Sequence, residues 1–315
     1  MMNIVLATDD NFAQHCGTAL KSITANNSDV HFFILTEGLN SVNSNRLADV
    51  ASENGCTLEF CIVPSEIVKY FPMSKMASNH ISIATYYRLF VTTLLPTTVD
   101  KIIYLDGDMI IRGSLKNLWN TDLTNAPLAA VYQHNAWADH NNSWSRLNIP
   151  REYGYFNAGC LVLNLSYLRS INLQQRAIDY INNHFDNIIS HDQDVLNALF
   201  YDKARVLDCK WNFLPLFLDK KLSYAEFPIK CQYKAEIASV GFEPIVIHFV
   251  FKPKPWNYGC TNPYKNEYFK YLKQTPWRDY KVKFSIKEYC KYIILPSFKR
   301  LVYSLFIRVI RRNVC

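Results

Sequence analysis

The first half of the chain alternates short apolar runs with segments in which apolar residues recur at helical spacing. The apolar runs have the length and composition of buried strands; they are residues 3–8, 31–36, 57–63 and 101–105. Segment 11–26 shows the helical spacing, and segment 41–55 has Ser41 or Asn43 as a start signal and Gly55 as a stop signal. Strands that alternate with helices predict an α/β fold with a doubly wound, mostly parallel sheet and helices on both faces.

The second half of the chain is less regular. Its strand-like and helical segments are residues 126–133, 158–165, 173–184, 192–200 and 244–249. A polar loop rich in Trp and Asn, residues 134–156, lies between the first two of these segments. Because no internal repeat or low-complexity linker interrupts the pattern, we expect one domain over residues 1–280 and a tail over residues 281–315.

Acidic residues directly follow two of the predicted strands. Asp9 and Asp10 follow the first strand, and Asp106 follows the fourth, in KIIYLDGDMIIRGSL. Ligands bind beyond the carboxyl ends of strands in such sheets, so these acids are expected at one binding edge. Asp106 and Asp108 flank one residue, and on an extended backbone both would point to the same side. That arrangement suits Mg²⁺ or Mn²⁺; the alternative is a β-turn with Asp and Gly in their usual places.

A second cue for a metal is His248, which ends the last predicted strand and precedes FVFKPKPW. Two carboxylates and one imidazole would favour Mn²⁺, since imidazole is a poor ligand for Mg²⁺. The alternative is that this single His is structural. Lys252 and Lys254 would suit a diphosphate beside the metal, or else they belong to a solvated loop.

Composition and charge exclude several classes of protein. The chain is 49% hydrophobic and 19% charged, which is typical of a globular protein. It has nine scattered cysteines without a C-x-x-C motif, as expected of reduced thiols in a cytosol. The start, MMNIVLATDD, does not predict a secretory signal, and no apolar run approaches the ~20 residues of a membrane span.

The net charge of +7 is concentrated in the tail. Residues 281–315 hold nine Lys or Arg and one acid, Glu288, so residues 1–280 carry −1. A nucleic-acid enzyme spreads basic residues around its site, so nucleic acid is not an expected partner. After Pro296 the apolar residues are separated by 3, 1, 3, 1, 3 and 1 positions, which places them on one side of an α-helix. This stripe consists of Phe298, Leu301, Val302, Leu305, Phe306, Val309 and Ile310.

The stripe and the basic residues around it predict an amphipathic helix that binds an anionic membrane surface. The basic residues are Lys299, Arg300, Arg308, Arg311 and Arg312. The protein would then be cytoplasmic and peripheral, on the inner face of the cell membrane. The alternative is that the stripe packs on the main domain or on a second subunit.

Several motifs together carry a family resemblance. They are LATDDNF, HISIATYYRL, IIYLDGDMII, YFNAGCLVLNL, HDQDVLNALF, and IHF followed by KPW. In this order and spacing the chain resembles the retaining glycosyltransferases of family 8. It is similar to bacterial lipopolysaccharide glucosyl- and galactosyltransferases and, more distantly, to glycogenin. The resemblance covers about residues 3–280 and implies a GT-A fold that binds a UDP-sugar across a divalent metal, Mn²⁺ or Mg²⁺.

The resemblance also implies roles for individual residues. Asp106, Asp108 and His248 would be the metal ligands, with Asp106 also near the substrate. Arg88 matches the basic residue that reaches the donor sugar or diphosphate, and Lys254 matches the phosphate-binding lysine.

Further positions match the contacts to the donor. The uridine and ribose contacts would be Ala7, Asp9 and Asn11. The contacts to the hydroxyls and the reacting face of the donor sugar would be Asn157, Asp192 and Gln193. The chain departs from the family pattern at Phe251, where close relatives usually have Gly, and at Gln133, where an acidic residue is common.

The implied reaction transfers a hexose, galactose or glucose, from a UDP-sugar to a cell-surface glycan acceptor such as lipopolysaccharide. Arg88, Asp192 and Gln193 would be its catalytic residues. Retention by double displacement needs a carboxylate nucleophile, but Gln193 is an amide, so we expect front-face return with Asp194 as the reserve nucleophile. The alternative functions are a non-catalytic sugar-nucleotide or glycan binding protein and a metal-dependent phosphohydrolase.

Overall fold

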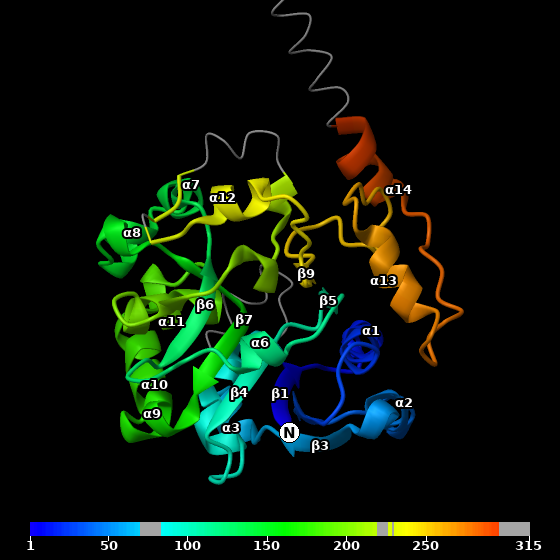
Figure 1. Cartoon of the computed structure of the whole chain (residues 1–315), viewed down its shortest axis with the longest axis horizontal. Helices are drawn as coiled ribbons and strands as arrows, with labels where there is room; N and C mark the ends of the chain where they lie inside the picture. Colours follow the sequence, from blue (N-terminus) through cyan, green and yellow to red (C-terminus); the bar gives the residue numbers. More distant parts are fainter. Residues whose placement is uncertain (70–82, 219–225, 229, 296–315) are drawn as a thin grey trace, which may run out of the picture. The chain divides into compact units, whose positions relative to one another are not determined.

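The computed structural model describes residues 1–69, 83–218, 226–228 and 230–295 (Figure 1). The chain divides into two compact units, Met1–His248 and the residues from Phe249 onward.

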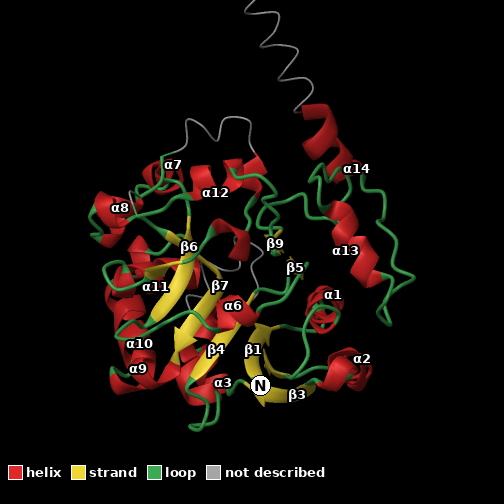
Figure 2. Ribbon diagram, in the orientation of Figure 1, coloured by secondary structure: helices red, strands yellow, loops and turns green. Residues whose placement is uncertain are grey.

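A sheet of seven strands in the order β3-β2-β1-β4-β7-β6-β8 forms the centre of the first unit (Figure 2). β7 runs antiparallel to β4 and β6, and the other neighbouring pairs are parallel. The predicted α/β fold with a mostly parallel sheet is therefore confirmed. The strands are β1 (Met2–Ala7), β2 (Val30–Thr36), β3 (Thr57–Ile62), β4 (Lys101–Leu105), β6 (Leu128–Tyr132), β7 (Phe156–Asn164) and β8 (Arg205–Val206).

The central strands are buried on both faces. All five residues of β6 are buried, as are Ile102–Leu105 of β4. Because successive side chains of a strand point to opposite faces of the sheet, both faces must be covered. This burial explains why these strands are continuous apolar runs in the sequence rather than alternating ones.

The strand order reverses between β1 and β4. β1 pairs in parallel with β2 on one side and with β4 on the other, in the register Ile4↔Ile103 and Val5↔Tyr104. The carboxyl ends of β1 and β4 therefore meet at one edge of the sheet, which is where ligands bind in folds of this kind. The acids that follow these two strands lie at this edge, as predicted.

Helices follow most of the strands. The longer ones are α1 (Ala13–Thr24), α2 (Ser41–Ala51), α10 (Leu173–Asn183) and α11 (His191–Phe200). The shorter ones are α3 (Ser65–Val68), the 3₁₀ helix η2 (Ile83–Phe90), α5 (Val91–Leu94), α6 (Lys116–Trp119), α9 (Leu165–Ser170) and α12 (Tyr233–Ala238). The cap of α2 is Asn40, not Ser41 or Asn43, because the Asn40 side chain accepts a hydrogen bond from the Asn43 N–H at 2.9 Å.

The segment predicted to be a polar loop, residues 134–156, is folded. It forms α7 (Asn135–His140), α8 (Ser143–Leu147) and the 3₁₀ helix η3 (Arg151–Tyr153). Ala138 of α7, Leu147 of α8, Ile149 and Tyr155 form a buried apolar cluster within this segment. The prediction of a loop was wrong. The apolar residues of this segment are few and widely spaced among Asn and Trp, but the cluster that they form is enough to stabilise short helices.

A second sheet joins β5 (Met109–Ile111) to β9 (Val246–His248) in antiparallel register. Met109 pairs with His248, and Phe213 forms a bridge with Ile247 on the other side of β9. The pairing in this small sheet places the end of β9 beside the residues that follow β4.

The second unit contains α13 (Lys265–Leu272), α14 (Ile286–Tyr289) and the π-helix η8 (Cys290–Ile294). The Glu288 carboxylate accepts hydrogen bonds from the Asn257 side chain and the Tyr258 N–H, both at 3.0 Å. Glu288 thus ties α14 to Asn257 and Tyr258 of the same unit. The division at residue 280 stays a prediction, and the predicted amphipathic helix at 298–310 lies outside the described residues. Within the described residues, no helix combines the length and the apolar character that crossing a bilayer requires.

Candidate active site

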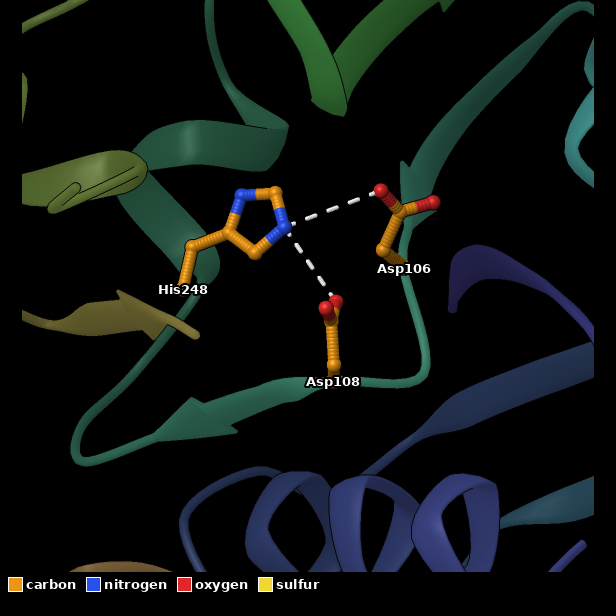
Figure 3. A group of neighbouring side chains, drawn as sticks. All are labelled: Asp106, Asp108 and His248. Atoms are coloured by element: carbon orange, nitrogen blue, oxygen red, sulfur yellow. Dashed lines mark ion pairs between the residues drawn. The ribbon is translucent and has the colours of Figure 1, made fainter. Parts of the chain in front are cut away.

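Asp106, Asp108 and His248 converge at the carboxyl end of β4 (Figure 3). The His248 Nε2 atom lies 3.2 Å from the Asp108 Oδ1 atom and 3.7 Å from the Asp106 Oδ2 atom. One ligand atom from each of the three side chains lies within 4.8 Å of the others. His248 is buried, whereas the two carboxylates are partly exposed. Three residues from two distant parts of the sequence thus present their polar atoms to one point.

The backbone turns at Gly107 and Asp108 and is not extended there. The expectation that an extended strand would place both carboxylates on one side was therefore wrong, and the turn that was considered as the alternative is present. The turn still directs Asp108 toward Asp106 because it leads into β5, whose first residue pairs with His248. A β-carbon on Gly107 would lie 3.0 Å from the Phe12 ring, so the turn packs closely on the start of α1.

Gly159 on β7 provides the space that this group occupies. Its carbonyl accepts a hydrogen bond from the Asp106 N–H at 2.9 Å. A β-carbon at Gly159 would collide with the His248 ring and lie 2.8 Å from Asp106 Oδ2. The three side chains fit a divalent cation because hard carboxylate oxygens and one imidazole are a donor set that Mn²⁺ accepts.

Arg88 of η2 links Asp106 to Asp192. It is 4% exposed, and its guanidinium lies 2.7 Å from Asp106 Oδ1 and 2.8 Å from Asp192 Oδ2. It also lies over the Tyr104 ring, 4.3 Å from the centroid. Burial raises the pKa of the Asp106 and Asp192 carboxyl groups, and the Arg88 charge opposes both shifts. The positively charged Arg88 guanidinium is therefore held between Asp106 and Asp192, two of the predicted site residues.

Asn157 and Gln193 contact each other beside this ion pair. The Asn157 Nδ2 donates to Gln193 Oε1 at 3.0 Å, and the Ala158 N–H donates to the same oxygen at 3.0 Å. The neighbouring Asp192 accepts a hydrogen bond from the Thr85 hydroxyl at 2.7 Å. Gln193 directly follows Asp192 in the chain and contacts Asn157. The structure thus brings these three residues to the same edge of the sheet as Arg88 and Asp106.

Asp194, the reserve nucleophile, is buried and fully engaged. Its Oδ2 accepts the N–H groups of Ile189 and Ser190 at 2.7 Å each, and Arg146 contacts both carboxylate oxygens. Its Oδ1 accepts the Tyr155 hydroxyl at 2.7 Å. A carboxylate with this many donors is a poor nucleophile, since its charge is already shared among them.

Ala7, Asp9 and Asn11 lie at the carboxyl end of β1 and in the loop that follows it. The Asp9 carboxylate accepts the Phe12 N–H at 2.9 Å, which shapes the entry to α1. Because β1 and β4 are neighbours, this loop shares its edge with Asp106. The predicted uridine and ribose contacts are thus placed on the expected edge, and their role stays a prediction.

Lys252, Lys254 and Phe251 belong to the second unit. The Lys254 Nζ donates to the Val250 carbonyl at 2.8 Å, and Phe251 is exposed. The structure does not place these residues relative to Asp106, so the predicted phosphate contact of Lys254 stays a prediction.

Sequence reasoning missed Asn212 as a residue of this site. Asn212 lies beside β9, with its side chain 0% exposed between His248 and Asn157. It stands in a short segment, KWNF, that matches none of the motifs, so no signal in the sequence marks it. Gly159 and Tyr155 could have been found, because both lie within the YFNAG motif.

A cavity of about 670 Å³ lies beside the folded segment 134–156. Its lining comes partly from that segment and partly from residues 226–228 and 231–235. Its lining includes Asn135, Arg151, Phe227 and Gln232.

Comparisons with known proteins agree with this architecture. General stress protein A of Bacillus subtilis is 29% identical over 283 residues, which cover 88% of this chain and 95% of that protein. The lipopolysaccharide 1,3-galactosyltransferase of Salmonella typhimurium is 24% identical over 283 residues, covering 87% and 79% respectively. Among solved structures, the galactosyltransferase LgtC in complex with donor and acceptor sugar analogues matches with a TM-score of 0.77 and 27% identity, covering 93% of this chain and 100% of that one.

The match to LgtC shows that the α/β fold is of the GT-A type, as the sequence predicted. The model of the family described as Glycosyl transferase family 8 matches residues 3–260, which include the Asp106, Asp108 and His248 group. Since this match spans most of the sequence, the chain belongs to glycosyl transferase family 8.

Proposed function

We propose that the protein is a metal-dependent, retaining glycosyltransferase that moves galactose or glucose from a UDP-sugar to a glycan acceptor. The observation that carries this proposal is the convergence of Asp106, Asp108 and His248 at the edge where β1 and β4 end. The choice of hexose is supported by the similarity to relatives named for galactosyl and glucosyl transfer.

Asp106, Asp108 and His248 would hold Mn²⁺, or else Mg²⁺. The bound cation would supply Lewis-acid neutralisation of the diphosphate. The burial of His248 and the narrow space left by Gly159 support a single site of small volume.

Arg88 supplies a preorganised positive charge beside the same site. Its two carboxylate partners and the Tyr104 ring hold the guanidinium in place, so little reorganisation is needed when negative charge develops on a leaving group. Asp192, on the other side of Arg88, is the carboxylate we assign to the hydroxyls of the donor sugar. Lys254 would add a second cation on the phosphates.

The side-chain oxygens of Gln193 and Asp194 already accept hydrogen bonds within the protein, which supports retention by front-face return. Gln193 Oε1 already accepts two hydrogen bonds, and Asp194 is buried among donors. In the proposed step the bond between the anomeric carbon and the leaving phosphate oxygen breaks, and the acceptor hydroxyl oxygen bonds to the carbon on the same face. The hydroxyl proton moves to the leaving phosphate oxygen.

For the acceptor we propose a lipid-linked or lipopolysaccharide-type glycan. The cavity beside residues 134–156 combines the Phe227 ring with polar side chains, among them Arg151 and Gln232, and this mixture suits a sugar ring. The buried Asn135 Oδ1 has no hydrogen-bond partner among the described residues and could accept a sugar hydroxyl. The tail, residues 281–315, would hold the enzyme on the inner face of the membrane, where such an acceptor is anchored.

The test is release of UDP from a panel of UDP-sugars in the presence of Mn²⁺, without an acceptor. Slow, metal-dependent release from UDP-galactose or UDP-glucose is expected, together with thermal stabilisation by the donor; a ligand at ~100 times its Kd stabilises by about 2.7 kcal/mol. A phosphohydrolase would release inorganic phosphate, and a binding protein would be stabilised by the UDP-sugar while releasing nothing. Either of these two outcomes contradicts the proposal.

A further inference from the structure

A chain of side-chain hydrogen bonds connects His248 to Gln193. The His248 Nδ1 atom lies 2.9 Å from Asn212 Oδ1, and Asn212 Nδ2 donates to Asn157 Oδ1 at 2.8 Å. Asn157 Nδ2 then donates to Gln193 Oε1 at 3.0 Å. His248, Asn212 and Asn157 are buried, so water does not offer these groups an easy alternative partner.

Two backbone groups fix the direction of every bond in this chain. The Ala158 N–H points at one atom of the Gln193 amide, and the Gly159 N–H points at one atom of the Asn157 amide, each at 3.0 Å. A backbone N–H can only donate, so both of these side-chain atoms must be carbonyl oxygens. The Asn157 NH₂ group therefore faces Gln193, and its oxygen faces Asn212.

The same reasoning continues to the histidine. Because Asn212 faces the Asn157 oxygen, it must present its NH₂ group there and its own oxygen to His248. An oxygen acceptor at 2.9 Å requires a hydrogen on His248 Nδ1. A neutral imidazole carries one N–H, so its Nε2 then has a free lone pair. That atom is the one that faces Asp106 and Asp108.

We propose that Asn212 is a positioning residue that holds His248 in the tautomer whose Nε2 lone pair points at the metal site. This inference rests on the proposed function, since it gives the lone pair a metal to bind. A histidine ligand is oriented by the partner of its other ring nitrogen, and loss of that partner typically weakens metal binding 10–100-fold. Asn212 is itself held in place because Phe213 exchanges hydrogen bonds with Val246 and His248 of β9.

The chain of hydrogen bonds also extends beyond Gln193. The Gln193 Nε2 donates to the Tyr155 hydroxyl at 3.1 Å, and that hydroxyl donates to Asp194 at 2.7 Å. Burial and the Asp194 carboxylate raise the pKa of Tyr155 well above its ordinary value, so the hydroxyl keeps the proton it donates. One set of hydrogen bonds with a single direction therefore orients both the Gln193 amide and the His248 ring.

The test compares the Mn²⁺ affinity of Asn212→Leu and Asn212→Asp, measured from free Mn²⁺ by electron paramagnetic resonance without donor or acceptor. Leu removes the acceptor for His248 Nδ1–H, so Mn²⁺ should bind about 10–100-fold more weakly. Asp keeps an oxygen facing His248 but loses the donor to Asn157 Oδ1, so Mn²⁺ should bind more tightly to Asn212→Asp than to Asn212→Leu. If both variants lose affinity equally, or if Asn212→Leu binds as the wild type does, the proposal is wrong.

Asn27→Leu is the matched control for a merely structural effect. Asn27 is also buried, and its amide joins Ile23 to Leu115 without a hydrogen bond to any residue assigned to the site. Its loss should lower thermal stability and leave the Mn²⁺ affinity within two-fold of the wild type. If Asn27→Leu weakens Mn²⁺ binding as much as Asn212→Leu does, general destabilisation explains both and the positioning role is overturned.

Histidine ring ¹⁵N spectra separate failure of this inference from failure of the proposed function. In wild-type protein without metal, at alkaline pH, the ring of His248 should carry its hydrogen on Nδ1, and Asn212→Leu should shift the ring toward a mixture of tautomers. The His248→Ala spectrum assigns the signal. If the wild type binds no Mn²⁺ but shows this tautomer, the metal proposal alone fails. A hydrogen on Nε2 in the wild type would contradict the inference itself.

Discussion

Gly159 on β7 and His248 on β9 lie so close together that no side chain fits between them. A β-carbon at Gly159 would collide with the imidazole Cε1 atom and would lie 2.9 Å from Nδ1. The strands that carry these residues belong to different sheets. The glycine is therefore required for the packing of the two sheets around the Asp106 carboxylate and not for an unusual backbone angle.

Gly159→Ala should displace the His248 ring and disable the site. A misplacement of about 1 Å can reduce a reaction rate ~100-fold, and we expect at least that loss of sugar transfer together with weaker Mn²⁺ binding. Gly113→Ala is the control, because a β-carbon there would make ordinary contacts with Ile245 at 3.7 Å. Steady-state rates of both variants test this prediction. Equal activity of the two would refute the claim that Gly159 is needed to leave space for the His248 ring.

Asp108→Asn should leave the fold intact and remove metal-dependent activity. Loss of an outer contact to a ligand already costs 10–100-fold in metal affinity, so loss of a ligand should cost more than about 100-fold. Circular dichroism checks the fold, and a Mn²⁺ titration of UDP release checks the site. A variant that transfers sugar at a near wild-type rate would remove Asp108 from the ligand set. His248→Ala should similarly raise the Mn²⁺ concentration required.

Gln193→Ala should slow transfer by no more than about 100-fold, as expected for lost positioning. Loss of a covalent nucleophile, in contrast, can cost on the order of 10⁶-fold. Two donors, Asn157 Nδ2 and the Ala158 N–H, lose their acceptor in this variant, so some loss of stability should accompany the effect. Mass spectrometry of protein quenched during turnover should show no glycosyl adduct, and an adduct on Asp192 or Asp194 would overturn front-face return.

Arg146→Met should destabilise the protein strongly, because Arg146 and Asp194 form a buried ion pair. Their side chains are 8% and 0% exposed, with a 2.7 Å contact. Removing the cation leaves a buried carboxylate, at a cost of about 3 kcal/mol of unfolding free energy. Arg112→Met is the matched control, because its partner Glu243 is 71% exposed and such pairs contribute less than about 1 kcal/mol. Urea denaturation measures both, and equal losses would contradict the burial argument.

Truncation after Leu295 should release the protein from membranes without loss of catalysis. This variant keeps the contacts of Glu288 with Asn257 and Tyr258, so the second unit should remain folded. It removes five basic residues of the tail: Lys299, Arg300, Arg308, Arg311 and Arg312. Each of them contributes about 1 kcal/mol near an anionic leaflet. Sedimentation with anionic vesicles at low salt is the measurement, with UDP-sugar hydrolysis as the control. Full-length protein that ignores the vesicles would contradict the membrane prediction.

The sequence by itself determined the framework of the catalytic edge. Strands such as β2 and β4 are buried on both faces, and a strand of that kind is a continuous apolar run that local pattern identifies. The acids after β1 and β4 could then be placed on one edge, because parallel strands end together. The family motifs added Arg88 and Gln193, whose positions no pattern of apolar residues would have singled out.

The tertiary structure alone decided how these residues meet. The packing of the Gly107 turn on Phe12, the pairing of Met109 with His248 and the contact of Asn212 with His248 all join segments far apart in the chain. The folding of residues 134–156 likewise depends on an apolar cluster against which Tyr180, Ala198 and Tyr201, from a later part of the chain, also pack. Local sequence cannot encode such contacts separately, because the free energy that stabilises each one comes from the packing of distant segments against one another.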